Sequence, residues 1–316
     1  MPHIIDYDFG ISAIDSEFHR PMLAAIHLIV ENGRAAVIDT GSNDSVRLVM
    51  EALAAKGLEP QQVDWVILTH IHLDHAGGAS QLMRLLPNAM LTVHPRGARH
   101  MMDPRRLVQG AIDVYGADEM RRTYGKILPI PKERILETPH ESSLRLNGRE
   151  LVFLDTPGHA RHHVAIHDLE SGHVFAGDTF GLSYREIDCH GMQYVLPTSS
   201  PVQFDPQAYH RSIDLVAGKK PQAMYLTHFS QVRDIARLAS DMHRLVDAHA
   251  ALALREKDAG PQRLERLEAG VTGIVLGEAE RYRWTLPRER ILAVYGLDIS
   301  LNAQGLGAWL DADGHA

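Results

Sequence analysis

Four residues within one short stretch could bind metal ions together: His70, His72, Asp74 and His75. Alternate side chains of an extended segment point the same way, so His70 and His72 can share one metal. Asp74 and His75 follow where the chain turns, and they can reach a second metal beside the first. Imidazole and carboxylate ligands suit zinc, iron or manganese. The stretch therefore predicts a site for two metal ions.

The sequence around this stretch predicts how it is positioned. The apolar run Val63 to Thr69 is typical of a buried strand, and residues 79–86 have helical spacing. A loop between a strand and a helix is a common place for functional residues. Three further candidate ligands also come directly after apolar runs: His159, Asp178 and His228.

The hydrophobic pattern along the whole chain alternates between strand and helix signals. Strands are expected at residues 22–30, 35–39, 63–69, 90–94, 143–146, 150–154, 164–167, 173–176 and 223–227. Helices are expected at 45–56, 79–86, 97–126 and 232–254, and the tail segments 270–277, 288–295 and 306–310 are expected to be helices or short elements. The order predicts an α/β protein. Strand signals thin out near residue 232, so a metal-binding catalytic domain is expected over 1–232 and a mostly helical extension over 233–316.

The chain resembles the metallo-β-lactamase-fold superfamily over roughly residues 20–232, with most similarity to its glyoxalase II-like and lactonase-like branch. The matching motifs are Thr69 to Gly78, Asp39-Thr40-Gly41, Thr156-Pro157-Gly158-His159, Ala176-Gly177-Asp178 and Thr227-His228. The resemblance implies a four-layer αβ/βα sandwich with two metals at one edge of the sheets. It also implies that residues 97–126 form a helical insertion that caps the active site.

The same resemblance implies a role for each candidate ligand. One metal would be bound by His70, His72 and His159, a second by Asp74, His75 and His228, and Asp178 would bridge them. A water or hydroxide between the metals would be the nucleophile, because metal binding lowers its pKa toward neutrality. Asp74 and Asp178 are therefore expected to be catalytic as well as metal-binding.

Asp178 helps to select a function within the superfamily. True β-lactamases typically lack this bridging aspartate, whereas thioesterases, lactonases and phosphodiesterase-type members have it. The predicted function is a binuclear hydrolase that cleaves a thioester, a lactone or another ester of a small-molecule substrate. One alternative is a phosphodiesterase on the same metals, and another is a di-iron redox protein or pathway effector with little turnover. Zinc is the first expectation for the metal, and iron and manganese stay open.

Several weaker signals each allow two interpretations. His163 resembles the second histidine of a Gly-His-x-x-x-His pattern, and it either supports a ligand or touches substrate, or is simply hydrogen-bonded locally. Tyr184 and Tyr194 follow Asp178. One interpretation is that a tyrosine in this region stabilises a developing oxyanion, and the other is that these tyrosines pack in the wall of the cleft. Asp39 and Thr69 are expected to support ligands or form turns. Basic residues in the insertion either grip an anionic substrate or form a solvated helix face: Arg99, Arg105, Arg106, Arg121, Arg122 and Lys126.

Composition limits the partners and the location. The net charge of −8 disfavours nucleic acid as a partner. Cys189 is the single cysteine, so no disulfide within the chain is possible. Residues 1–10 lack a basic region followed by an apolar run, and no window of eighteen apolar residues occurs, so no membrane partner is expected. These features predict a cytoplasmic protein. The helical extension is expected either to cover the substrate cleft or to form a homodimer.

Overall fold

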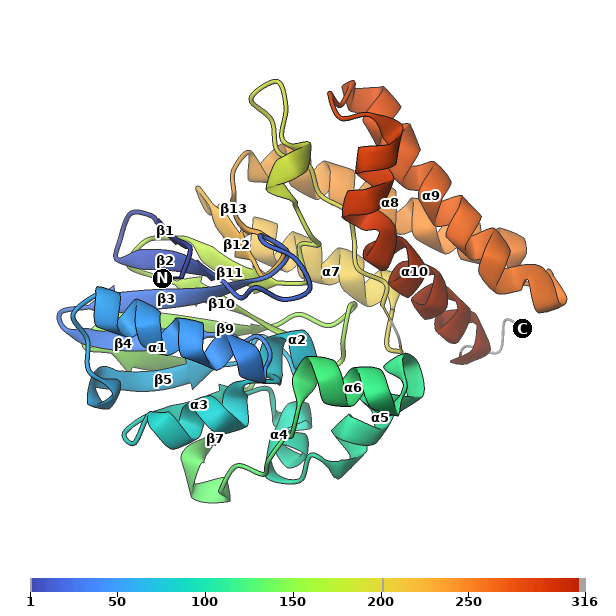
Figure 1. The fold of residues 1–316 in the computed structure, drawn as a ribbon. Coiled ribbons are helices and arrows are strands. Elements are labelled where there is room, and N and C mark those ends of the chain that lie inside the picture. The colour runs from blue at the N-terminus through green and yellow to red at the C-terminus, as the bar shows by residue number, and fades with distance from the viewer. Residues whose placement is uncertain (1, 201, 313–316) are drawn as a thin grey trace.

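Two β-sheets form the centre of the protein in the computed structural model, which describes residues 2–200 and 202–312 (Figure 1). The first sheet has the strand order β1-β2-β3-β4-β5-β6-β7, and the second has the order β13-β12-β11-β10-β9-β8. The strands of the first sheet are Ile4–Asp6, Ile11–Asp15, Ala25–Glu31, Arg34–Ile38, Val63–Ile67, Met90–Val93 and Ile135–Glu137. The strands from β8 to β13 are Ser143–Leu146, Arg149–Asp155, Val164–Asp168, Val174–Gly177, Met224–Leu226 and Ser230–Val232.

Ten α-helices accompany the sheets within the described residues. Helices α1 to α6 are Val46–Ala55, Leu73–Ala76, Ala79–Leu85, Pro95–Met102, Arg105–Tyr115 and Ala117–Tyr124. Helices α7 to α10 are Pro206–Ala217, Ile235–Glu256, Arg263–Tyr282 and Arg288–Ala312. Short 3-10 turns lie at Asn43–Ser45, Pro60–Gln62, Lys132–Arg134, Arg185–Ile187 and Gly260–Gln262.

Apolar residues on both faces of each sheet produce a layered arrangement. Ile38 of the first sheet and Phe153 of the second belong to one buried cluster between the sheets. Val49 of α1 joins a cluster on the outer face of the first sheet, and Met242 of α8 joins one on the outer face of the second. Strands buried on both faces need helices as cover. The predicted four-layer αβ/βα sandwich with a helical C-terminal region is confirmed.

Strand direction decides where the functional side chains meet. β4, β5 and β6 are parallel neighbours, and β11 is parallel to β12. β9 and β11 both pair antiparallel with β10, so they run in the same direction as each other. Side chains that follow β9, β11 and β12 therefore emerge at one edge of the second sheet. In open α/β sheets, ligands commonly bind beyond the carboxyl ends of the strands.

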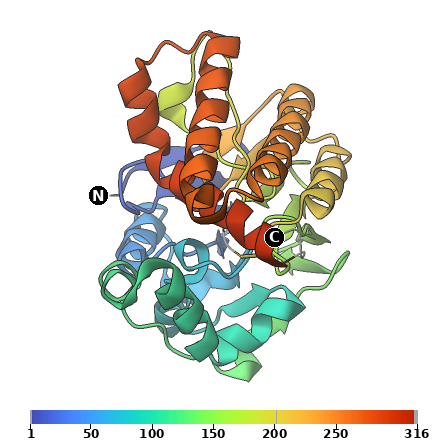
Figure 2. The ribbon, with the colours of Figure 1, turned by 90° about the vertical axis from the view of Figure 1, so that its right-hand side faces the viewer.

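The insertion and the tail lie at this same end of the molecule. The predicted helical stretch 97–126 is three helices, α4, α5 and α6, and the tail is three long helices, α8, α9 and α10. The short tail segments that were expected separately are parts of α9 and α10. Figure 2 views this end, with α4–α6 below and α8–α10 above. A domain boundary near residue 232 stays a prediction.

The sequence patterns missed several elements. β1 and β2 precede the first predicted strand, and α7 was not predicted. β1 and β2 are short, with three and five residues, so alternation has little length in which to appear. The start of α7 did carry a readable signal, because Asp205 caps it and Pro206 is its first residue.

No helix within the described residues is long and apolar enough to cross a membrane. Cytoplasmic location and homodimer formation stay predictions from the sequence.

Candidate metal centre

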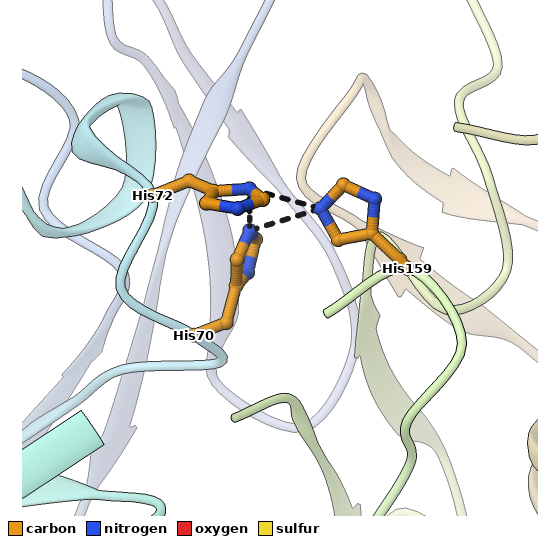
Figure 3. Close-up of side chains that lie close together, drawn as sticks. All are labelled: His70, His72 and His159. Atoms are coloured by element: carbon orange, nitrogen blue, oxygen red, sulfur yellow. Dashed lines mark hydrogen bonds between the residues drawn. The ribbon is translucent and has the colours of Figure 1, made fainter. Parts of the chain in front are cut away.

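Three imidazole rings converge on one point at the edge of the sheets (Figure 3). His70 Nε2 lies 2.9 Å from His72 Nδ1, and His159 Nε2 lies 3.2 Å and 3.0 Å from these two atoms. A nitrogen of a neutral imidazole either donates or accepts a hydrogen bond. Of three such nitrogens, at least two must both be donors or both be acceptors. These two nitrogens cannot form a hydrogen bond with each other. A cation between the three nitrogens would satisfy all of them, so the geometry fits a metal ion.

A second group of ligand atoms lies beside the first. Asp74 Oδ2 lies 3.5 Å from His75 Nε2 and 3.4 Å from His228 Nε2. Asp178 reaches both groups, because its Oδ1 lies 3.4 Å from His75 Nε2 and its Oδ2 lies 3.5 Å from His159 Nε2. His75 Nε2 and Asp178 Oδ1 are buried without a hydrogen-bond partner among the described residues. Unpaired buried polar atoms are rare, and a bound metal would account for both.

The other nitrogen of three of these histidines is held by the protein. His159 Nδ1 lies 2.8 Å from the Thr198 hydroxyl and 3.1 Å from the Thr198 carbonyl, to which it donates. His228 Nδ1 donates to the Leu23 carbonyl at 3.0 Å. His75 Nδ1 lies 2.8 Å from Asp39 Oδ2. A carbonyl or carboxylate oxygen can only accept, so each bond places the proton on Nδ1 and leaves Nε2 free to bind a metal. The surroundings therefore select the tautomer that metal binding requires.

Asp39 joins three parts of the site. It follows β4 with a left-handed backbone, φ +58°. Its carboxylate accepts hydrogen bonds from the Thr69 backbone at 2.9 Å, the Thr69 hydroxyl at 2.9 Å and the Thr227 hydroxyl at 2.9 Å, as well as from His75. Thr69 precedes the first ligand motif, and Thr227 precedes His228. One buried carboxylate therefore fixes two ligand loops and one ligand ring.

We expect Asp39→Asn to weaken metal binding and turnover by about 10- to 100-fold, the usual cost of losing an outer-shell partner of a metal ligand. In asparagine, an NH2 group replaces one of the two carboxylate oxygens. This donor would face a donor from Thr69, Thr227 or His75, so a hydrogen bond would be lost. Metal affinity can be measured by competition with a chromogenic chelator. The matched control is Asp64→Asn, because Asp64 of β5 forms a partly exposed ion pair with Arg34 of β4. Equal metal affinity of the Asp39 variant and the control would contradict the role of Asp39.

The charges around the two groups differ. Burial and the neighbouring histidines lower the pKa of His70 well below its ordinary value. Burial, together with His159, lowers the pKa of His72 to about 3. Burial opposes charge on His228 too, but Asp178 and Asp74 outweigh it and raise the pKa of His228 to about 9. The first group is thus neutral at pH 7, the form that binds metal, and the carboxylates attract positive charge to the second.

His163 lies under the bridging aspartate rather than in the cleft. Its Nε2 accepts the backbone N–H of Asp178 at 3.1 Å. Its Nδ1 lies 2.8 Å from the Thr156 hydroxyl and 3.0 Å from the Thr179 hydroxyl. The ring is fully buried and does not line the cavity above the site. This position does not match contact with substrate, and it matches both support of a ligand and a locally hydrogen-bonded histidine, so the role of His163 stays a prediction.

Tyr184, a candidate catalytic residue, is also packed away from the cavity. Its buried hydroxyl donates to both carboxylate oxygens of Asp298 at 3.1 Å, and Arg20 covers its ring. Tyr194 is buried as well, with its hydroxyl 3.4 Å from Cys189 Sγ. The expectation that Tyr184 holds an oxyanion is therefore corrected: its ring packs against Tyr295 of α10, with the centres of the two rings 5.4 Å apart.

Asp298 is a site residue that sequence reasoning missed. It belongs to α10, and its carboxylate lines the cavity together with Asp178 and His228. Burial raises the pKa of Asp298 to about 6, while His228 and the Tyr184 hydroxyl act in the opposite direction. A single acid in a helical tail has no motif around it, so no sequence signal could have identified it.

A cavity of about 710 Å³ opens above the ligand groups. His72, Asp74, Asp178 and His228 lie at its base, and residues of α5, α6 and α10 form its walls. Of the six basic residues considered for gripping an anion, Arg106 alone lines it. The side chains of Arg105, Arg121 and Arg122 are 75–87% exposed and pair with Asp103, Asp118 and Glu119. The interpretation as a solvated helix face therefore describes most of this group.

Comparisons of the sequence with known proteins agree with this site. A family model for the metallo-beta-lactamase superfamily matches residues 20–228. A metallo-beta-lactamase fold-containing protein from Sulfurisphaera tokodaii is 24% identical over 212 residues, which cover 66% of this chain and 73% of that protein. A hydroxyacylglutathione hydrolase from Xanthomonas campestris is 28% identical over 152 residues, which cover 48% of this chain and 44% of that enzyme. The chain thus spans less than half of the length of this hydrolase.

A comparison of structures extends the likeness to the helical tail. A metallo-beta-lactamase family protein from Thermus thermophilus matches with a TM-score of 0.64 at 19% identity, covering 99% of this chain and 92% of that one. At this identity the likeness shows the fold alone. The match to the family model spans more than half of the chain and includes all seven candidate ligands, and the chain therefore belongs to the metallo-β-lactamase superfamily.

Proposed function

We propose that this protein is a binuclear metal-dependent hydrolase that cleaves a thioester, a lactone or another ester. The observation that carries the proposal is the position of Asp178, whose two carboxylate oxygens face two separate ligand groups. One group would be His70, His72 and His159, and the other Asp74, His75 and His228. Members of this superfamily are mostly hydrolases, which supports the reaction class.

The residues of the chain would prepare the site for hydrolysis in several ways. Metals bound there would supply a Lewis acid and a water of lowered pKa. Asp178 is held at its backbone, where His163 accepts from its N–H and Tyr209 donates to its carbonyl at 2.8 Å. These bonds fix the backbone from which the Asp178 carboxylate extends. His72 and Asp74 line the cavity, so a scissile carbonyl would enter from that side.

The donor atoms support zinc as the first proposal for the metal. Five histidines and two aspartates form a nitrogen and oxygen ligand set that zinc accepts readily, and iron or manganese can also occupy such a set. The phosphodiesterase alternative would use the same two metals, which can stabilise a phosphodiester without further cations. The acidic net charge of the chain weighs against a nucleic-acid substrate, and a substrate panel decides between the two reactions.

The test is the metal content of protein purified without chelators, followed by a substrate panel. About two zinc ions per chain are expected, as in other two-metal sites. Chelation should abolish ester hydrolysis, and added zinc should restore it. The panel compares a thioester, a lactone and a simple ester with a chromogenic phosphodiester. Protein without bound metal, or turnover greatest on the phosphodiester, would refute the proposal. Two irons with oxygen-dependent redox activity and no hydrolysis would favour the redox alternative.

A further inference from the structure

Helix α5 presents an apolar face that the protein buries only in part. Leu107, Ala111 and Val114 recur at helical spacing and line the cavity above the candidate metal centre. None of the described residues of this helix is fully buried. An amphipathic helix gains most of its stability from covering such a face. The face therefore suits an apolar ligand that fills the cavity.

Helix α10 provides the opposite wall. Leu297 and Leu301, one turn apart, also line the cavity, and Leu297 is 41% exposed. Tyr115 at the end of α5 is 38% exposed, and Val202 beside the cavity is 62% exposed. Large apolar side chains that stay exposed around one concave surface commonly mark a binding site. These walls come from the insertion and the tail, which are outside the strands that carry the ligands.

The charges in the cavity are mostly negative. The charges of Asp74 and Asp178 would be offset by the metals that they bind, and Glu119 is paired with Arg122. Apart from these groups, the lining holds the carboxylates of Asp113 and Asp298 against the guanidinium of Arg106. Charges interact more strongly in a partly desolvated cavity than in water. A substrate with a carboxylate on its acyl group would therefore be repelled, and an uncharged chain would not. This argues against the expectation that the insertion grips an anion.

We propose that the substrate is an ester, thioester or lactone whose acyl group is a long, uncharged apolar chain lying between α5 and α10. This inference rests on the proposed hydrolase function and adds the substrate class. Asp298 is a specificity residue in this scheme, because it excludes acyl chains that carry a negative charge. The scissile carbonyl would lie over His72 and Asp178, and the chain would run away from them along Leu107 and Leu297.

The test uses zinc-loaded protein at about pH 8. The substrates are 4-nitrophenyl acetate, butyrate, hexanoate and octanoate, with the adipate monoester as the charged counterpart of hexanoate. We expect kcat/KM to rise by up to about four-fold per added methylene, the limit set by burial of one such group. Adipate should be at least roughly ten-fold poorer than hexanoate. A flat series, or equal rates on adipate and hexanoate, would overturn the inference.

Two variants and a control tie the preference to the cavity. Leu297→Asp should lower the ratio of octanoate to acetate turnover by about ten-fold, since it places a charge on the wall. Leu264→Asp changes an exposed leucine on α9 outside the cavity and should leave that ratio as it is. Asp298→Asn should raise the ratio of adipate to hexanoate turnover. Unchanged ratios in both cavity variants would contradict the assignment.

A binding measurement separates this inference from the proposed function. Absence of turnover on every ester, acetate included, would count against the hydrolase. Calorimetry would then still test the inference, because it measures binding affinity and needs no turnover. The ligands are butanamide, hexanamide, octanamide and adipamic acid. Tighter binding of octanamide than butanamide, with weak adipamic acid, supports the apolar cavity. Equal affinities refute it.

Discussion

Asp178→Asn is expected to lose at least one bound metal and to reduce turnover by well over about 100-fold, the upper end of the cost of losing an outer-shell partner. The amide keeps the size of the side chain but supplies one oxygen instead of two. In the structure, one carboxylate oxygen faces His75 and the other faces His159. The asparagine side chain therefore has one oxygen, which can bind a metal in one ligand group but not in both.

His72→Ala should have an effect of similar size for a different reason. His72 Nδ1 is one of three nitrogens that converge within 3.2 Å of each other, and the first group keeps only two without it. The measurements are metal content by element-resolved mass spectrometry and kcat/KM on the best ester. Circular dichroism should be unchanged.

Asp155→Asn is the matched control for Asp178→Asn. Asp155 also ends a strand of the second sheet, but its carboxylate lies 3.2 Å from His94 rather than at the metal centre. Near-normal metal content and turnover are expected in this variant. If Asp178→Asn kept two metals and full turnover, the seven-residue site would be wrong.

The second large effect concerns stability. Arg149→Met alone should lower the free energy of unfolding by about 3–5 kcal/mol, because it leaves the Asp168 carboxylate buried without its partner. Asp168→Leu alone should cost less than this, because Glu31, 3.4 Å from Arg149 Nη1, still offsets part of the guanidinium charge. The side chains of Arg149 and Asp168 are 1% and 0% exposed and join the start of β9 to the end of β10. Arg149 Nε lies 2.9 Å from Asp168 Oδ1, and Arg149 Nη1 also donates to the Phe9 carbonyl at 2.6 Å. Urea denaturation gives the measurement.

The double variant Arg149→Met with Asp168→Leu should recover part of this loss, since no unpaired charge stays buried. Recovery is partial because Phe9 loses a donor, and Ser171 and the Glu170 N–H lose an acceptor. Arg34→Met, in the partly exposed pair with Asp64, should cost no more than about 1 kcal/mol. A cost below about 1 kcal/mol in both buried single variants would contradict the prediction.

Much of the candidate site could be predicted from short stretches of the sequence. The spacing of the first four candidate ligands needs only an extended segment and a turn. His70 and His72 lie in the segment that follows β5, and Asp74 and His75 lie in the short helix α2. His159, Asp178 and His228 were found because each follows an apolar run. Parallel directions of β9, β11 and β12 then bring their ends to one edge. The rule that strand ends carry functional residues pointed to these three positions, and the resemblance to the superfamily selected them as ligands.

The direction of other side chains could not be predicted. Tyr184 and His163 follow the ligand motifs closely, yet both point into the protein and hold Asp298 and Asp178. A sequence gives the position of a residue along the chain, whereas the face to which its side chain turns depends on packing. The missed helix α7 supplies Tyr209, which donates to the Asp178 carbonyl.

By itself, the sequence determined the family, the layered fold and the seven residues that meet at the candidate metal centre. These depend on local spacing and on strand ends, which are properties of short segments. The tertiary structure alone decided what surrounds that centre: the support of His75 by Asp39, the entry of Asp298 from α10, and the apolar walls of the cavity. The physical reason is that a cavity is made by side chains distant in sequence, and only the packed chain determines which of them face it.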